Sequence, residues 1–221
     1  MSKNVERIFI KNARLSFPAL DEPAETMKGN KDLKYQATFI IERDNPCVKE
    51  IKLAIGRLAQ AEWKDRAKQV LANADKLPLK DGNRRSVPGY ENMLYVAAKS
   101  KNKPDLVDAN PKNRITDPKE IREKFQAGYR VNGYVDLFPY EFSGMRGIGA
   151  ALVSVQFAAY DTVFSGVSKP KANDYPDCTE QAADSMEYEN IQGADTSFDT
   201  AQYEDDGGND GDDDGISQYL V

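Results

Sequence analysis

Aromatic and basic side chains alternate with apolar ones in two segments of this chain of 221 residues. In residues 129–142, Val131, Val135 and Leu137 share one face if the segment is a strand, because side chains alternate across a sheet. The other face then carries a polar and aromatic series: Arg130, Asn132, Tyr134, Asp136, Phe138, Tyr140 and Phe142. Four rings on a polar strand face are unusual for a solvated surface. Exposed rings of this kind would stack on nucleic-acid bases, whereas rings covered by a helix would belong to the core.

The second segment, residues 93–103, places Tyr95, Lys99 and Lys101 on one face, together with Ala97 and Lys103. A ring followed by lysines has the composition of a phosphate-binding track that ends on a stacking surface. The alternative is a charged edge strand exposed to solvent. The preceding loop, GNRRSVPGY, places two arginines near a tyrosine and could fold over a bound strand. Further candidates are weaker, and the full set is Arg14, Phe17, Lys34, Tyr35, Arg84, Arg85, Tyr90, Tyr95, Lys99, Lys101, Arg130, Tyr134, Phe138, Tyr140 and Arg146.

The distribution of charge supports a polyanionic partner. All 30 lysines and arginines lie in residues 1–171, which hold 21 acidic residues, so the net charge of this part is 30 − 21 = +9. Residues 172–221 hold the other 15 acidic residues and no basic residue, so their net charge is −15. A basic body joined to an acidic segment indicates nucleic acid as a partner.

Several kinds of catalysis are excluded by composition. The chain has no histidine, which removes Ser-His and Cys-His nucleophiles and histidine metal ligands. Cys47 and Cys178 are too far apart in sequence to suggest a zinc cluster or a disulfide framework, so both are expected to be reduced thiols. Asp210, Asp212, Asp214 and Gly215 match the start of an EF-hand loop, but its twelfth position is a valine instead of glutamate. We therefore expect no cofactor, no metal and no enzymatic activity.

Hydrophobic periodicity predicts five main strands and two helices. The long helix begins with Asn45 as cap and Pro46 at its first position, and it fades near Asn73. The short helix follows Asp117 and Pro118 and ends at Gly128. The expected strands are residues 5–17, 33–43, 93–100, 129–142 and 147–161, and residues 77–92 are expected to form a loop.

This order predicts a mainly β fold: a five-stranded OB-fold, which is a small Greek-key barrel. The long helix is then an insertion between strands 2 and 3, and the short helix lies between strands 3 and 4. Residues 1–171 form the predicted basic barrel domain. Residues 172–221 hold few large apolar side chains, which predicts a disordered acidic tail with a hydrophobic tip.

Five segments can be compared with a known family: KNARLSFPALDEP, KYQATFIIERDNP, PLKDGNRRSVPGYENMLYVAAKSKNKPDLVDANPKNRITDP, GYRVNGYVDLFPYE and GIGAALVSVQ. Together they resemble a family of phage-encoded single-stranded DNA-binding proteins. The similarity spans roughly residues 7–165. It implies an OB-fold, single-strand binding in phage replication or recombination, and no catalysis. The acidic tail resembles those of bacterial and other phage single-stranded DNA-binding proteins, although bacterial tips end on Pro-Phe and this one ends on Tyr219, Leu220 and Val221.

The function expected from the residues and from this resemblance is sequence-independent binding of single-stranded DNA in the cytoplasm of an infected bacterium. The tail would compete with DNA, and its tip would bind replication or recombination proteins through Ile216, Tyr219, Leu220 and Val221. Double-stranded DNA as a second ligand and a homo-oligomeric state are left open. No segment approaches the ~20 apolar residues of a membrane span, so no membrane partner is expected. The alternatives are a replication adaptor with incidental DNA binding and a metal-dependent nuclease.

Overall fold

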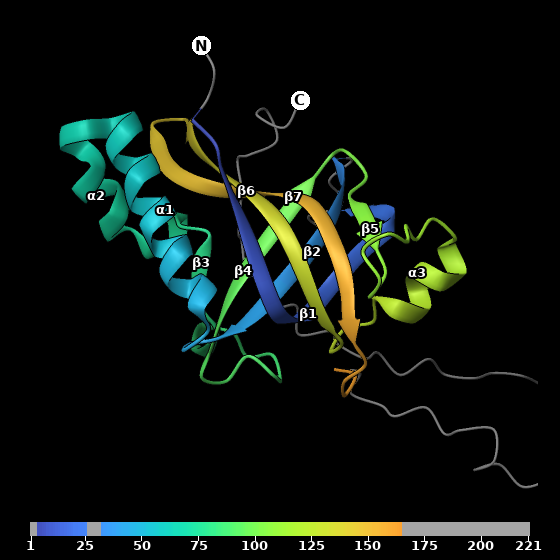
Figure 1. Cartoon of the computed structure of the whole chain (residues 1–221). Helices are drawn as coiled ribbons and strands as arrows, with labels where there is room; N and C mark the ends of the chain where they lie inside the picture. The colour runs from blue at the N-terminus through green and yellow to red at the C-terminus, as the bar shows by residue number, and fades with distance from the viewer. Residues whose placement is uncertain (1–3, 26–31, 165–221) are drawn as a thin grey trace, which may run out of the picture. The chain divides into compact units, whose positions relative to one another are not determined.

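The computed structural model describes residues 4–25 and 32–164 of the chain, and these form a β-barrel flanked by helices (Figure 1). Five strands build the barrel: β1 (Glu6–Glu25), β2 (Leu33–Glu42), β4 (Met93–Ser100), β6 (Arg130–Phe142) and β7 (Met145–Ala159). Their antiparallel order is β4-β2-β1-β6-β7, and a parallel pairing of β4 with β7 closes the ring. This is the strand arrangement of an OB-fold, so the expected fold class is confirmed.

Strand β1 is shared by two neighbours and holds the barrel together. Its first half, from Glu6 to Arg14, pairs with β6, and its second half, from Arg14 to Glu25, pairs with β2. Register shifts interrupt both pairings, and Phe17 within one of them has a positive φ of 45°. Bulges bend a strand and increase its twist. A 20-residue strand can therefore curve around the barrel and serve both sides.

The long inserted helix is confirmed, but it is interrupted. Helix α1 (Pro46–Trp63) begins at Asn45, whose side chain accepts a hydrogen bond from the backbone N–H of Cys47 (3.1 Å). After Trp63 the chain takes a left-handed conformation at Lys64 and a 3₁₀ turn, η1 (Lys64–Arg66), before α2 (Ala67–Ala72). The prediction of one continuous helix to residue 73 was wrong. No proline or glycine marks the break, and the turn allows α2 to bury Ala67 and Val70.

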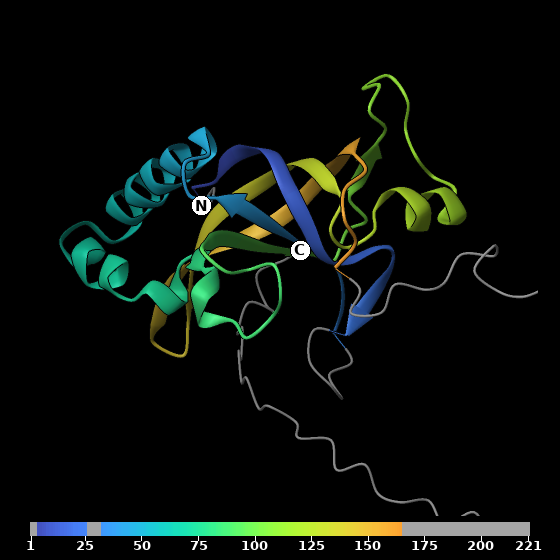
Figure 2. The ribbon, with the colours of Figure 1, turned by 90° about the horizontal axis from the view of Figure 1, so that it is seen from below.

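Helix α1 covers the barrel with its apolar face. Ile51, Ala54, Ile55 and Leu58 are buried in the same cluster as the inward side chains of the strands, and α1 contacts β1, β6 and β7. Cys47 is buried at the start of this helix, and burial raises the pKa of its thiol. A raised pKa keeps the thiol protonated and unreactive, so Cys47 contributes to packing. In Figures 1 and 2, α1 and α2 lie on one side of the barrel and α3 (Pro118–Lys124) lies on the other.

The loop predicted for residues 77–92 contains more structure than expected. It follows the 3₁₀ turn η2 (Ala74–Lys76) and includes strand β3 (Leu79–Asp81), which pairs with β4, and the 3₁₀ turn η3 (Gly82–Arg84). Farther along, β5 (Asp105–Val107) pairs in parallel with the end of β7. Strands of three residues leave too short a pattern to read from alternation, which explains why β3 was missed.

The predicted tail and its tip lie outside the described residues, as does Cys178. Within residues 4–25 and 32–164, no helix is long and apolar enough to cross a membrane. The same residues contain no group of three or more Cys, Asp or Glu side chains placed to hold a metal ion.

An ionic cluster joins the end of β7 to β1 and β6. The guanidinium of Arg130 donates to Asp161 Oδ2 (2.8 Å), and Arg14 Nε lies 3.7 Å from the same oxygen. Arg14 also donates to the backbone oxygens of Gly128 (3.1 Å) and Thr162 (2.6 Å). The backbone N–H of Thr162, and then Arg130, hold the pKa of Asp161 below its ordinary value. The cluster therefore anchors the segment that leaves the barrel.

We predict that Gly133→Ala destabilises the barrel, because a Cβ atom there would lie 2.5 Å from the ring of the buried Phe39. Overpacking of this kind costs about 1–3 kcal/mol. The matched control is Gly56→Ala in α1, where a Cβ atom meets nothing within 4 Å. This control should gain about 0.5–1 kcal/mol from helix propensity. Urea unfolding followed by Trp63 fluorescence measures both, and a Gly133→Ala variant as stable as the parent would contradict the packing argument.

We also predict that Asp161→Asn lowers stability by about 1 kcal/mol at pH 7, since a charge-assisted hydrogen bond is lost. The folded-state pKa of Asp161 is lowered, so its contribution is present above about pH 4, the ordinary aspartate range, and disappears as the pH falls through the folded pKa. The difference between parent and variant in urea unfolding should shrink as the pH is lowered below about 4. Glu123→Gln on the exposed side of α3 serves as control and should change little. An equal loss at pH 7 and pH 3 would rule out a role for the charge.

Candidate nucleic-acid interface

The residues proposed from the sequence fall on two surfaces of the barrel. One is the outer face of β2 and β4 with the loop of residues 82–91, hereafter the lysine face. The other is the outer face of β6, together with its neighbours β1 and β7. The members on the lysine face are Phe17, Lys34, Arg85, Tyr90, Tyr95, Lys99 and Lys101, whereas Tyr35 alternates with Lys34 and shares the inward face of β2 with Ala37 and Phe39. Strands β2 and β4 are the second and third strands of the barrel, which form the surface that binds oligonucleotides in many OB-folds.

Lysines gather at one end of the lysine face. The β2–β4 register pairs Tyr35 with Ser100, and so places Lys34 beside Lys101. The ammonium of Lys34 lies 3.1 Å from Asp32, and that of Lys101 lies 3.8 Å from the same carboxylate. Lys34 is almost fully buried, whereas the side chain of Lys101 is 43% exposed. Lys99 lies on the same outer face of β4, and Lys103 follows in the connection from β4 to β5.

Three aromatic rings surround Arg85 at the other end of the lysine face. Its guanidinium carbon lies 5.0 Å from the ring centre of Tyr95 and 5.4 Å from those of Tyr90 and Phe17. Tyr90 and Tyr95 pack edge to face with their centres 5.3 Å apart, and both are buried against Ile40. Phe17 is 48% exposed. Among these rings, Phe17 therefore presents a surface to solvent, and Tyr90 and Tyr95 support the loop.

The rings of β6 have different environments. Phe138 is buried against Gly149, and the ring of Tyr140 lies against Gly147, its partner across the β6–β7 pair. An aromatic ring fills the space that a cross-strand glycine leaves open. Tyr134 is 43% exposed. Base stacking requires an exposed ring, so on β6 it is Tyr134 that meets this requirement, and Phe138 packs inside the protein instead.

Three other arginines of the predicted set, apart from Arg85, bind carboxylates. Arg84 pairs with Asp75 (2.7 Å), Arg130 pairs with Asp161 (2.8 Å) and Glu42 (3.4 Å), and Arg146 makes two hydrogen bonds to Glu141 (2.9 and 2.8 Å). These partners reduce the positive charge that each arginine offers to a phosphate.

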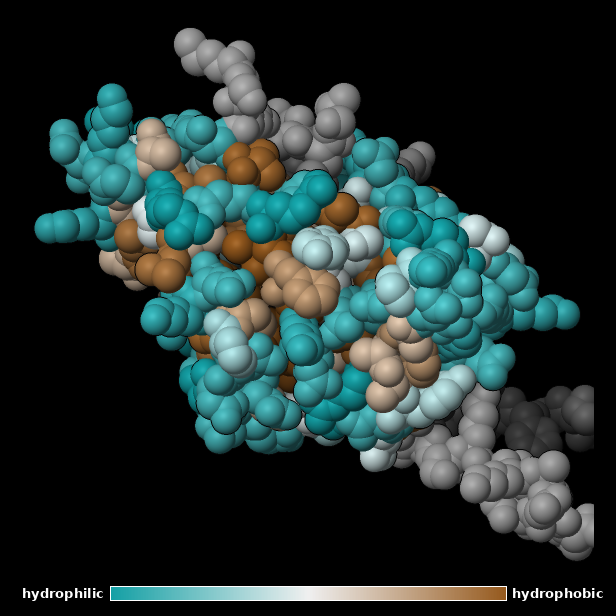
Figure 3. Space-filling view, in the orientation of Figure 1, coloured by the Kyte–Doolittle hydropathy of each residue, from teal (hydrophilic) through white to brown (hydrophobic). Residues whose placement is uncertain are grey.

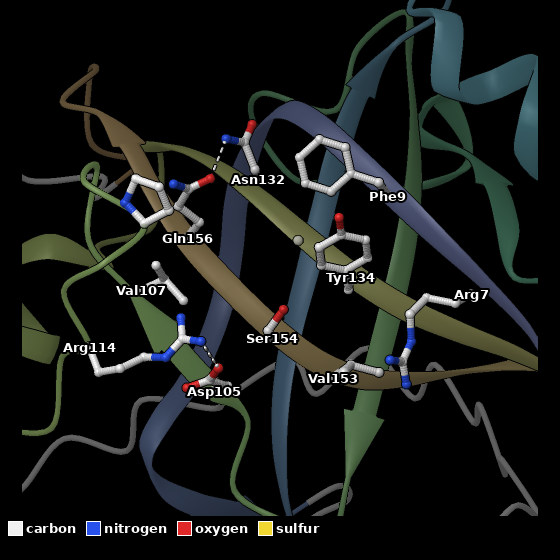
Figure 4. Close-up of a pocket in the computed structure, with 12 residues that line it drawn as sticks. Arg7, Phe9, Asp105, Val107, Arg114, Asn132, Tyr134, Val153, Ser154 and Gln156 are labelled. Atoms are coloured by element: carbon white, nitrogen blue, oxygen red, sulfur yellow. Dashed lines mark hydrogen bonds and ion pairs between the residues drawn. The ribbon is translucent and has the colours of Figure 1, made fainter.

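Sequence reasoning missed a groove beside Tyr134. It is about 670 Å³ in volume and is lined by residues of β1, β6, β7 and the segment 105–114 (Figure 4). Phe9 lies opposite Tyr134 in the β1–β6 register, and their ring centres are 4.8 Å apart. The sequence contained one indication of this groove: Phe9 alternates with Ile8 and Ile10, which places its ring on the face of the strand that points away from the core.

The sequence of this chain matches a family of known proteins. Residues 6–186 match the model of the family described as Enterobacter phage Enc34, ssDNA-binding protein. The chain is 30% identical over 178 residues to protein p50 of Acyrthosiphon pisum secondary endosymbiont phage 1, a match that covers 77% of this chain and 93% of p50.

The fold of this chain also aligns with solved structures of phage single-stranded DNA-binding proteins. The single-stranded DNA-binding protein from bacteriophage Enc34 in complex with ssDNA aligns with a TM-score of 0.63 and 26% identity, over 72% of this chain and 89% of that chain. The bacteriophage T7 protein gp2.5, a single-stranded DNA-binding protein, aligns with a TM-score of 0.50 and 13% identity, over 87% of this chain and 100% of that chain, which is a likeness of fold alone. From its sequence match and its barrel, this chain belongs to the family of the Enterobacter phage Enc34 ssDNA-binding protein.

Proposed function

We propose that this chain binds single-stranded DNA without sequence preference and does so on the lysine face. The observation that carries the proposal is the pair of lysines beside Asp32, Lys34 and Lys101, with Lys99 on the same outer face of β4 and Lys103 following in the connection to β5. Lysine side chains offer point charges to phosphates and do not read bases. A surface of this composition tracks a nucleic-acid backbone and tolerates any sequence.

Stacking would supply the second part of the affinity. Phe17 offers an exposed ring beside the guanidinium plane of Arg85, and both aromatic rings and arginine planes stack on splayed bases. The buried Tyr90 and Tyr95 hold Arg85 in place from below. A strand that crosses this face would meet cations at one end and a flat ring at the other.

The relatives support the same ligand, since the solved Enc34 protein is described in complex with ssDNA. We infer that the chain acts in phage DNA replication or recombination, in the cytoplasm of the infected host. The acidic segment 172–221 would compete with DNA for the lysine face, because its net charge of −15 is complementary to the barrel domain. Its tip, Ile216–Val221, would then bind partner proteins when DNA displaces the segment.

Two alternative functions can be distinguished from this proposal by experiment. A replication adaptor with incidental DNA binding would lose its affinity at physiological salt. A metal-dependent nuclease would cleave end-labelled DNA when Mg²⁺ is added. We infer binding without catalysis, which predicts intact DNA in that assay. Competition between single- and double-stranded oligonucleotides at two salt concentrations tests selectivity for the single strand.

We predict that Lys99→Ala combined with Lys101→Ala weakens single-strand binding and flattens its dependence on salt. Each phosphate contact contributes about 0.7 to the slope of log K against log salt, so two lost contacts should reduce the slope by about 1.4. Fluorescence anisotropy with labelled oligo-dT between low and high salt measures the slope. Lys68→Ala on the exposed side of α2 is the matched control and should leave the slope unchanged. An unchanged slope in the double variant would exclude the lysine face.

We predict that removal of residues 172–221 tightens binding to single-stranded DNA, most strongly at low salt, because the competing negative charge is lost. The same anisotropy titration compares the full chain with the truncated one. Replacement of the acidic residues by Asn and Gln at constant length is the control that separates charge from chain length. Weaker binding by the truncated protein would refute competition by the tail.

A further inference from the structure

The groove beside Tyr134 lies outside the lysine face and has a different chemistry. The rings of Phe9 and Tyr134 form one side, and Val107, Pro111 and Arg114 of the segment 105–114 form the other (Figure 4). Its volume of about 670 Å³ is within the range of pockets that hold small molecules. In the view of Figure 3, hydrophobic patches interrupt a hydrophilic surface over the barrel. The groove is thus a preformed hollow with aromatic and apolar sides.

The two rings form a rigid ledge. Phe9 and Tyr134 face each other directly across the β1–β6 pair and are tilted by 39°, with 37% and 43% of their surfaces exposed. Next to them, Arg7 makes two hydrogen bonds to Asp136, its own cross-strand partner (2.8 and 2.9 Å). Because these rings are already held by the sheet, they lose little conformational entropy when a ligand binds, and this favours stacking of a flat ligand on them.

The opposite wall is fixed to the barrel. Strand β5 pairs with β7 at Ser154 and Gln156, and Val107 forms a bridge with Arg114. Gln156 accepts a hydrogen bond from Asn132 (3.0 Å), and its own amide N–H donates to the backbone oxygens of Asp108 (3.2 Å) and Ala109 (3.4 Å). One glutamine therefore joins β6, β7 and the wall of the groove.

The polar groups around the groove favour a base over a phosphate. Arg7 is paired with Asp136, and Arg114 is paired with Asp105 (3.1 Å), so the charges nearest the groove sum to zero. A phosphate would need a net positive site. The hydroxyl of Ser154 faces the groove (Figure 4) and has no hydrogen-bond partner among the described residues. A ring ledge with one free hydroxyl suits a flat heterocycle with polar edges.

The groove is continuous with the lysine face along the chain and along the sheet. The parallel bridge between β4 and β7 pairs Lys99 with Ala151, and the β5–β7 pair joins Asp105 to Ser154. Ala151 and Ser154 are three residue steps apart along β7, which is about 10 Å at 3.3 Å per residue. Lys101 and Lys103 lie in the connection from β4 to β5, between the two surfaces. Lys99, Lys101 and Lys103 therefore lead along the chain from the lysine face toward the groove.

We propose that the groove is a second nucleobase site, in which a base of the same single strand stacks on Phe9 and Tyr134 after the backbone has crossed the β4–β7 seam. This inference rests on the proposed single-strand binding and adds its path: the strand wraps from the outer face of β2 and β4 to that of β6. A long strand occupies both surfaces, and a short one occupies the lysine face alone.

The test compares the double variant Phe9→Leu, Tyr134→Leu with the parent on oligo-dT of about 20 and about 6 nucleotides, which bracket most of the site sizes of OB-folds. Removal of the stacking rings should weaken binding of the long strand by about 5- to 100-fold and leave the short strand unchanged. Photocrosslinking of the long strand, with 5-iodouracil in place of thymine, should label Tyr134 in the parent.

Three controls make the result decisive. Tyr134→Phe keeps the ring and should bind as the parent does, and Tyr160→Leu removes a tyrosine that is 60% exposed but outside the groove. Unchanged short-strand affinity shows that the double variant is folded. A double variant that binds the long strand like the parent, with no crosslink at Tyr134, would overturn the groove site alone. A parent chain that binds neither length would instead overturn the proposed function.

Discussion

Closure of the barrel depends on the parallel contact between β4 and β7. The other barrel pairings are antiparallel, and this one joins the two strands at the ends of the order β4-β2-β1-β6-β7. The β4–β7 contact forms because β1 bends enough to pair with β6 through its first half and with β2 through its second half. The bridge lies at Lys99, so the same contact that closes the fold also places the lysine face beside the groove.

The local patterns of the sequence were sufficient for the strands and both helix starts, because each of these has a signal within a few residues. Asn45 and Asp117 cap their helices as expected, and both are followed by proline. The break after Trp63 was not predicted because no proline or glycine marks it, and β3 was not predicted because its three residues, between Pro78 and Gly82, are too few to show an alternation. Both depend on packing against distant strands, which a local pattern does not contain.

The candidate site was predicted less completely, for a related reason. Alternation gave the correct outward face of β6, but exposure also depends on what lies across the sheet. Phe138 is buried because its neighbour on β7 is Gly149, and Tyr90 is buried because its loop folds back onto β2 and β4. The groove unites residues from Arg7 to Gln156, so it exists only after the barrel has closed.

In the closed barrel, arginines and lysines have different roles: most arginines form ion pairs, and lysines supply hydrated surface charge. At least nine of the eleven arginines form an ion pair with Asp or Glu, and many of these pairs join residues far apart in sequence. The guanidinium fork suits such fixed, two-pronged contacts, whereas lysine remains a hydrated point charge. The positive excess of the barrel domain is therefore not spread evenly over its surface. It includes the lysines at the end of β2 and β4, and in the proposed path these lysines direct a bound strand toward the groove.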